Sequence, residues 1–359
     1  MMDGSNAIAS DAPRIGTLAA GPRDAISDVA GVTVGHVTLS RGPVQTGVTV
    51  VRPHPGDVYR DKVPAAVSVL NGFGKSVGLL QVEELGVLET PIALTNTFSV
   101  GAVAEAQIRQ AVAANPEIGR ELPTVNPLVF ECNDGYLNDI QAMSVRGADY
   151  LAACACADAG FEQGAVGAGR GMSCFAFKGG IGSASRLSRP LDGRCWTVGA
   201  LVLANFGRQP LLTVAGRPFG RWLAAQAQAS NDAPEKGSII LLLATDAPLD
   251  ARQLRRLSLR AGAGLARTGS VFGHGSGDIA LAFSTAYTVP HLPDRPMPTQ
   301  PMLHETRLDP LFEAAADAIE QAIVHALWRA ETVTGRDGHV RRSIREAIPQ
   351  WRRWLEQGA

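Results

Sequence analysis

The sequence predicts a mostly antiparallel β-sheet system covered by helices, an α+β arrangement within the α/β class. Two observations lead to this prediction. Strand-like and helical segments fall into groups along the 359 residues, and consecutive strand-like segments are joined by connections of hairpin length. A Rossmann-type sheet would instead alternate single strands with single helices. The frequent Gly and Pro residues follow no repeating period, which is typical of a loop-rich globular chain rather than a fibre.

The first half of the chain begins with a polar stretch and a predicted hairpin. Residues 1–22 are small and polar, so we expect a flexible arm there. Two β-branched segments, 31–40 and 46–53, flank Arg41-Gly42-Pro43, which is typical of a turn. The spacing of apolar residues then predicts strands at 65–70 and 91–97 and helices at 78–89, 101–115 and 140–160.

The second half opens with three consecutive strand-like segments. A polar stretch at 226–236, which we expect to be mobile, follows them and precedes six apolar residues, Ile239 to Ala244. An uninterrupted apolar run of this length indicates a fully buried strand. The remaining expectations are strands at 173–180, 183–188, 195–205 and 278–287, and helices at 250–266 and 310–330.

The composition excludes several kinds of partner. The 33 basic and 34 acidic residues leave a net charge of -1 without long runs of either sign, which argues against nucleic acid or an anionic membrane. No apolar leader or membrane-length apolar stretch stands out, so we expect a cytoplasmic protein.

The cysteines lack the paired spacing of a zinc site or a disulfide framework, so we expect buried free thiols and no metal. They are Cys132, Cys154, Cys156, Cys174 and Cys195.

Gly237 and Ser238 stand where the polar stretch meets the buried strand. If the Ser238 hydroxyl cut the preceding peptide bond through an N-to-O acyl shift, the new chain start would carry a nucleophile and an amine on one residue. An α-amino group has a pKa of about 7.7 to 8.0, so it can act as a general base at neutral pH. A Gly-Ser pair before a strand is also a common loop end, and the pattern alone leaves both interpretations open.

A second group of polar residues precedes the predicted strand at 278–287. Ser276 and Asp278 are two residues apart, so a hydroxyl and a carboxylate can project to the same side. An ordinary turn with a capping Asp is the alternative. His274 is a further candidate base, although loop histidines are more often surface residues.

Two more segments offer polar groups at strand ends. Asn205 ends an apolar segment, where its amide could donate to an oxyanion or simply terminate the strand. Glu131, Asn133 and Asp134 cluster in "FECNDGYLND", where a carboxylate could hold an ammonium group or the residues could form an Asx turn. The Gly-rich stretch 164–172 lacks the Lys-Ser/Thr of a phosphate loop and leads into a strand, so we discount nucleotide binding.

Taken together, these segments resemble the self-processing family of L-aminopeptidase/D-Ala-esterase/amidases and β-peptidyl aminopeptidases. The matching blocks follow in order over nearly the full chain. They are "ISDVAGVTVGH", "TGVTVV", "LNGFG", "PIALTNT", "ECNDGYLNDI", "VGAGRGM", "FKGGIGSASR", "TVGALVLANFG", "GSIILLLATDAPL", "GSGDIALAFSTA" and "DPLFEAAADAIEQAI".

The resemblance implies that Ser238 is the nucleophile and that the chain is cut between Gly237 and Ser238. One domain, 1–359, would then consist of an α-subunit, 1–237, and a β-subunit, 238–359. Ser276 and Asp278 are implied as partners of the nucleophile, although other members can carry Glu where this chain has the shorter Asp278.

The same resemblance implies the groups that contact the substrate. Asn205 would donate to the oxyanion, and Glu131 would meet the free amine of a small peptide, amide or ester substrate. Some members use a Tyr in the "ECNDGY" stretch to assist the oxyanion. The aligned position here is Asn133, and Tyr136 is the other candidate.

The implied fold is a four-layer αββα sandwich, similar in layout to N-terminal-nucleophile hydrolases, and it requires no cofactor. The implied assembly is a homo-oligomer of αβ units, which the Ala-rich helices would suit. Two alternatives remain open. One is an acyltransferase or unusual-amide hydrolase of similar self-cleaving layout, where Thr is the typical nucleophile. The other is a non-catalytic, uncleaved homologue, since a fold does not guarantee its chemistry.

Overall fold

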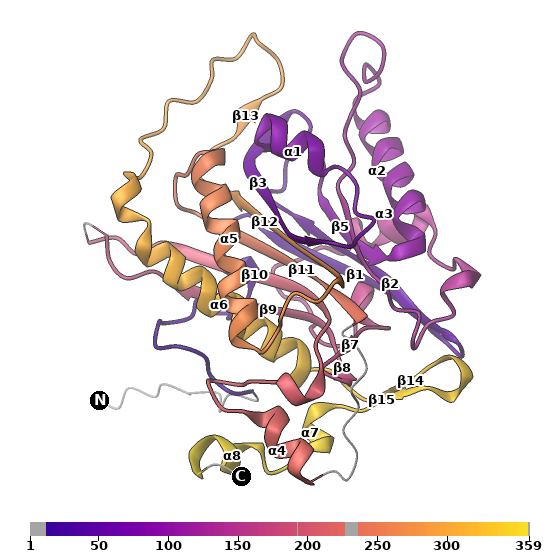
Figure 1. Ribbon diagram of the computed structural model, residues 1–359. Coiled ribbons are helices and arrows are strands. Elements are labelled where there is room, and N and C mark those ends of the chain that lie inside the picture. The colour runs from indigo at the N-terminus through magenta and orange to yellow at the C-terminus, as the bar shows by residue number, and fades with distance from the viewer. Residues whose placement is uncertain (1–11, 192, 227–235, 358–359) are drawn as a thin grey trace, which may run out of the picture.

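Two β-sheets lie face to face between two layers of helices (Figure 1). The computed structural model describes residues 12–191, 193–226 and 236–357. The smaller sheet has the order β1 (Thr33–Arg41), β2 (Val44–Arg52), β5 (Ile92–Asn96) and β6 (Val129–Cys132). The larger has the order β13 (Val289–Pro290), β3 (Asp61–Gly72), β12 (Gly275–Ser284), β11 (Lys236–Thr245), β10 (Thr197–Asn205) and β9 (Gly180–Leu187), with β4 (Val87–Leu88) paired to β3.

Helices cover the outer face of each sheet. The helices on the smaller sheet are α2 (Val100–Ala114) and α3 (Gly147–Ala155), and those on the larger are α5 (Ala251–Arg267) and α6 (Asp309–Trp328). The shorter helices are α1 (Leu79–Leu85), α4 (Phe219–Gln226), α7 (Ile344–Ala347) and α8 (Trp351–Gln357). This arrangement confirms the predicted αββα sandwich.

Two-residue strands and 3₁₀ turns complete the described elements. The small strands form two pairs, β7 (Ser173–Cys174) with β8 (Phe177–Lys178) and β14 (Val333–Thr334) with β15 (Val340–Arg341). The 3₁₀ turns are Ile26–Asp28, Thr97–Ser99, Ile140–Ala142, Gly167–Gly169, Gln209–Leu211, Glu305–Arg307 and Arg336–Gly338.

Strand β11 shows why its sequence is an uninterrupted apolar run. Ile239, Leu241 and Leu243 pack toward the cluster beneath α5 and α6, whereas Ile240 and Leu242 pack into the core between the two sheets. Both faces of the strand are therefore buried, so its sequence does not alternate between apolar and polar residues. Each fully buried side chain of this size stabilises the fold by about 1.5–3 kcal/mol. The predicted buried strand is confirmed.

Most neighbouring strands are antiparallel, as predicted from their short connections. β9, β10 and β11 follow each other as antiparallel neighbours. The exceptions are the parallel pairs β11 with β12 and β5 with β6. Helix α5 lies in the first of these two connections and α2 in the second, which agrees with the long crossover that parallel strands require.

Three predicted elements differ from the structure. The expected helix 140–160 is a 3₁₀ turn followed by α3 alone, and the helix 78–89 ends as α1 at Leu85 because Gly86 adopts a φ of 67°. The expected strand 173–180 is the β7–β8 hairpin, since Phe175 and Ala176 turn the chain with φ values of 50° and 64°. Strand β6 and helices α4, α7 and α8 were not predicted.

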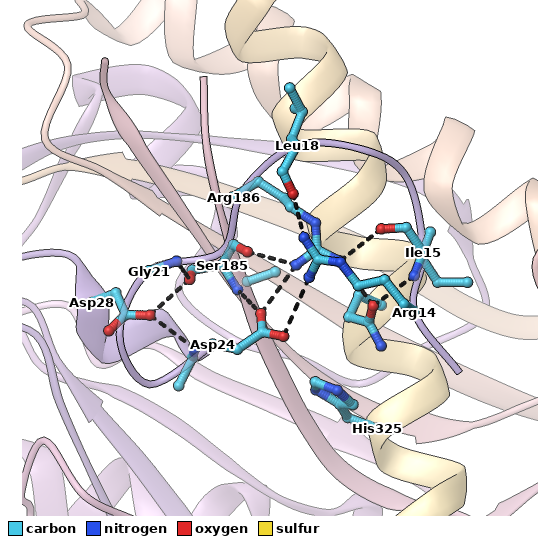
Figure 2. A network of polar contacts seen from close by, with 12 residues as sticks. Arg14, Ile15, Leu18, Gly21, Asp24, Asp28, Ser185, Arg186 and His325 are labelled. Carbon is cyan, nitrogen blue, oxygen red and sulfur yellow. Dashed lines mark hydrogen bonds and ion pairs between the residues drawn. The ribbon is translucent and has the colours of Figure 1, made fainter. Parts of the chain in front are cut away.

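The expectation of a flexible arm at 1–22 is wrong for its described part, because residues 12–22 are docked on α6 and β9. The buried Arg186 guanidinium donates to the Ile15 carbonyl (2.9 Å) and to Asp24 Oδ1 (3.0 Å), as Figure 2 shows. Gln321 of α6 accepts the Ile15 N–H (2.8 Å). These contacts satisfy the backbone of a segment whose polar composition had suggested disorder. Residues 1–11 lie outside the described ranges.

Three further expectations concern the polar stretch 226–236, the cysteines and membrane-spanning helices. Most of the predicted mobile stretch 226–236 lies outside the described residues, which exclude 227–235. All five cysteines are free, but Cys156 and Cys195 are exposed rather than buried, because one caps α3 and the other precedes β10. Within the described ranges no helix is both long and apolar enough to cross a membrane.

Candidate active site

Ser238 and Asn205 occupy paired positions on the neighbouring antiparallel strands β11 and β10. Residues directly opposite each other in such a pair project to the same face of the sheet. Ser238 alternates in step with Ile240 and Leu242, so this is the face toward the other sheet. Both side chains are 6% exposed. The structure therefore brings together a hydroxyl and an amide that are distant in sequence.

Gly237 directly precedes Ser238 within β11. A Cβ built on Gly237 would lie 2.2 Å from the Asn205 carbonyl oxygen and 2.9 Å from Phe206 Cα. The end of β10 thus packs directly on the backbone of residue 237. Any side chain there would displace β10, which explains why the residue before Ser238 is glycine.

Strand β12 supplies the polar groups on the other side of Ser238. The Gly277 N–H donates to Ser238 Oγ (3.1 Å), and the parallel register places Ser276 level with Gly237. Ser276 Oγ in turn donates to Asp278 Oδ1 (2.5 Å), and both side chains are fully buried. The predicted projection of Ser276 and Asp278 to one side is therefore seen, and the short Asp side chain reaches its partner.

The Asn205 amide has a defined orientation. Its Oδ1 accepts the Ser173 N–H (2.8 Å), while its Nδ2 donates to the Asn133 carbonyl oxygen (3.0 Å). Arg341 Nε donates to Ser173 Oγ (3.1 Å), which ties the C-terminal β14–β15 hairpin to the same region. Since a carboxamide carries two N–H donors, Nδ2 retains one for a further acceptor on the face that Ser238 shares.

Glu131 lies at the end of β6 and is only 3% exposed. Its Oε1 accepts the Lys75 backbone N–H (2.8 Å), and its Oε2 accepts the Thr97 hydroxyl. Both donors are uncharged, so these contacts orient the carboxylate without neutralising it. A carboxylate held in this way can recognise a cationic ligand.

Other predicted residues take less central places. The Asn133 side chain closes an Asx turn by accepting the Gly135 N–H (2.9 Å), so its backbone oxygen rather than its amide contacts Asn205. Tyr136 stacks on His339, with ring centroids 4.6 Å apart. His274 is exposed and its ring lies 6.0 Å from that of Phe73.

The sequence did not reveal three groups that orient the site, namely Ser173, Thr97 and the Lys75 N–H. Thr97 is the last residue of the segment "PIALTNT", which carries part of the resemblance. Its contact with Glu131 could not be predicted from that segment, because it depends on the parallel pairing of β5 and β6. The sequence predicts a continuous strand at 173–180, whereas the structure has the β7–β8 hairpin there. This hairpin directs the Ser173 N–H toward Asn205.

Two buried ionisable groups lie near this cluster. Burial raises the pKa of Asp134 to about 7, although hydrogen bonds from Thr46 and Asn138 act in the opposite direction. Burial also lowers the pKa of Lys178 well below its usual range. Lys178 Nζ donates to the carbonyl oxygens of Gly169 (2.8 Å), Met172 (2.8 Å) and Gly179 (2.7 Å), and so it joins the Gly-rich loop to the β7–β8 hairpin.

The layered fold and the polar cluster at one end of β10, β11 and β12 define a hydrolase with a variant of the N-terminal-nucleophile hydrolase fold. Residues 24–341 match peptidase family S58. The chain belongs to this family, and it is a hydrolase of the aminopeptidase and amidase class.

Individual relatives agree with this assignment. The chain is 41% identical over 342 residues to the β-peptidyl aminopeptidase BapA of Sphingosinicella microcystinivorans, covering 89% of this chain and 85% of that protein. The crystal structure of the PH0078 protein of Pyrococcus horikoshii OT3 is similar with a TM-score of 0.89 and 48% identity over 95% of this chain and 97% of that one. The L-aminopeptidase D-Ala-esterase/amidase of Ochrobactrum anthropi gives 0.84 and 35%, covering 96% of this chain and 98% of that one.

Proposed function

We propose that this protein is a self-processed serine aminopeptidase that releases the N-terminal residue of short peptides, amides or esters through an acyl-enzyme on Ser238. The pairing of Ser238 with Asn205, beside the Ser276–Asp278 hydrogen bond, is the observation that supports it most directly. The chain is cut between Gly237 and Ser238 into subunits 1–237 and 238–359, which stay together as one αββα domain.

The processing step forms and breaks bonds at the Gly237 carbonyl carbon. Ser238 Oγ attacks this carbon, the C–N bond to Ser238 breaks, and the nitrogen takes up the proton that the hydroxyl loses. Water then hydrolyses the resulting ester, which leaves a carboxylate on Gly237 and a free amine on Ser238. The packing of β10 against Gly237 supports this step, because it holds the scissile carbonyl within a rigid strand pair.

The free amine then acts on the hydroxyl of the same residue. It accepts the Ser238 Oγ proton during attack on a substrate carbonyl and returns a proton to the leaving amine or alcohol. Ser276 is level with the former peptide bond, so it is suited to orient the amine, while Asp278 orients Ser276. The remaining Asn205 N–H donates to the oxyanion. Water finally releases the acyl group and regenerates Ser238.

Glu131 accounts for cleavage one residue from the chain end. An ammonium group bound by this carboxylate sets the position of the first carbonyl relative to Ser238, which makes the reaction exopeptidic. Substrates with an N-terminal β-amino acid are included, because a relative is named a β-peptidyl aminopeptidase.

The working form proposed here is a homo-oligomer of cleaved αβ units. Exposed apolar side chains on α1, α2 and α3 support it, since such residues gather at subunit contacts. They are Leu80, Leu85, Ile108, Val112 and Leu151.

A matched pair of substrates tests the proposed reaction. β-Alanyl and L-alanyl p-nitroanilides are compared with their N-acetylated forms, which have the same scissile bond without the ammonium group. We expect hydrolysis of at least one free amine and at least a hundredfold lower kcat/KM for its acetylated form. Equal rates for both forms, or turnover of neither, would overturn the proposal.

A further inference from the structure

One short backbone segment connects the two functional parts of the site. The Phe73 N–H donates to the Ser276 carbonyl oxygen (3.3 Å), and two residues later the Lys75 N–H donates to Glu131 Oε1 (2.8 Å). Gly74 lies between these contacts. It is therefore held between the strand end beside Ser238 and the carboxylate that is suited to an ammonium group.

One carbon atom would fit beside Gly74, which has no side chain of its own. A Cβ built there would lie 3.5 Å from Glu131 Oε1, 3.7 Å from Ile279 Cδ1 and 3.9 Å from Gly277 Cα. One methyl group would thus touch the carboxylate and the residue whose N–H contacts Ser238 Oγ, all at ordinary van der Waals distances.

The backbone does not require glycine at position 74. The φ angle of Gly74 lies outside the left-handed region, in contrast to Gly78, whose φ is 92°. Gly277 differs in another way, since a Cβ there would lie only 2.8 Å from the Phe73 carbonyl oxygen. Gly277 is explained by close backbone packing, whereas neither packing nor backbone conformation explains Gly74.

We propose that Gly74 determines which first residue the enzyme accepts, and that the space it leaves admits β-aminoacyl substrates. This inference rests on the proposed function. With the substrate ammonium on Glu131 and its carbonyl at Ser238, the atoms between them would lie beside Gly74, because a Cβ there would be 3.5 Å from Glu131 Oε1 and 3.9 Å from Gly277 Cα. A β-amino acid places one more backbone methylene there than an α-amino acid. The missing side chain at position 74 makes room for that methylene.

The substitution Gly74→Ala fills the space with one methyl group. We expect kcat/KM for β-alanyl p-nitroanilide to fall at least tenfold more than kcat/KM for glycyl p-nitroanilide, in keeping with the selectivity of one methylene in a pocket. The cut at Gly237–Ser238 should be unaffected, because it involves no substrate ammonium. Gly72→Ala is the matched control, since its methyl group would meet only Val69 Cγ1, at 3.4 Å, and should change neither rate by more than twofold.

A second variant, Ile279→Val, enlarges the space beside Gly74 instead of filling it. Ile279→Val removes the Cδ1 atom that borders it, so we expect the ratio of β-alanyl to glycyl turnover to rise. This variant decides the question if Gly74→Ala does not fold. An equal loss on both substrates in Gly74→Ala, or an unchanged ratio in Ile279→Val, would overturn the role of Gly74 while leaving the aminopeptidase proposal standing. If the unsubstituted enzyme hydrolyses no free-amine amide, both proposals fail together.

Discussion

Asn205 and Ser238 face each other as direct cross-strand partners, and the Asn205 amide is oriented by Ser173 on one side and by Asn133 on the other. The oxygen of the amide is engaged by the Ser173 N–H, so its nitrogen is the atom left to donate toward a reacting carbonyl. This orientation is built from three segments of the chain that the αββα layers bring to one end of the larger sheet.

Replacing Asn205 by Ala should lower kcat by about 10²–10³-fold with little change in KM, because an oxyanion donor acts mainly in the transition state. Asn205→Asp should be as damaging, since it keeps the acceptor for Ser173 and loses the N–H donor. Steady-state kinetics on a free-amine p-nitroanilide measures both. A loss smaller than threefold in either variant would show that Asn205 does not serve the oxyanion.

Ser276 and Asp278 should act as one unit, because their side chains share a 2.5 Å hydrogen bond in a fully buried position. We expect Ser276→Ala and Asp278→Asn each to slow turnover by about 10²-fold or more, the range of a positioned proton-transfer group. The double variant should lose little beyond either single variant. Multiplied losses in the double variant would mean that the two residues act separately.

Glu131→Gln should raise KM for free-amine substrates by at least tenfold while leaving the cut at Gly237–Ser238 in place. The substitution preserves the size of the side chain and removes the charge that a substrate ammonium needs. Gel electrophoresis of the purified variant measures the cut, and substrate titration measures KM. Glu83→Gln on α1, at an exposed carboxylate paired with Arg255, is the control for removing one negative charge from the protein as a whole. An unchanged KM would remove Glu131 from amine recognition.

Asp134 should make the protein less stable as the pH rises from about 4 to 7. Burial raises its folded-state pKa from 3.8 to about 7, so in this window the folded state keeps a proton that the unfolded state releases. The shift corresponds to at most about 4 kcal/mol. We expect Asp134→Asn to gain stability relative to the unsubstituted protein between pH 4.5 and pH 8, measured by urea unfolding. A pH-independent difference between the two proteins would contradict the raised pKa.

The regular elements were the part of the fold that the sequence could predict. The apolar run Ile239–Ala244 and the helical spacing at 250–266 and 310–330 depend on local periodicity, and the structure has β11, α5 and α6 there. The β7–β8 hairpin was missed because a turn through two non-glycine residues with positive φ, Phe175 and Ala176, leaves no local signature. Likewise, the docking of residues 12–22 depends on a buried Arg186 distant in sequence.

The candidate site likewise has residues that the sequence could predict and supporting groups that it could not. The sequence offered Ser238, Asn205 and Glu131 as separate candidates, the resemblance implied their roles, and the structure places the first two on paired strands. The spacing of Ser276 and Asp278 allowed both side chains to project to the same side but left an ordinary turn as the alternative, and the structure shows the two side chains hydrogen-bonded. The supporting groups, such as the Ser173 N–H, could not be predicted from the sequence. Every residue except proline has a backbone N–H, and only the tertiary structure determines which of them points at the site.

The mass of the purified protein tests the central claim most directly, namely that Ser238 becomes a chain start. Intact-mass spectrometry of the active protein should show two polypeptides, residues 1–237 and 238–359, and Ser238→Ala should show one uncut, inactive chain. An active protein whose mass corresponds to all 359 residues in a single chain would contradict the account.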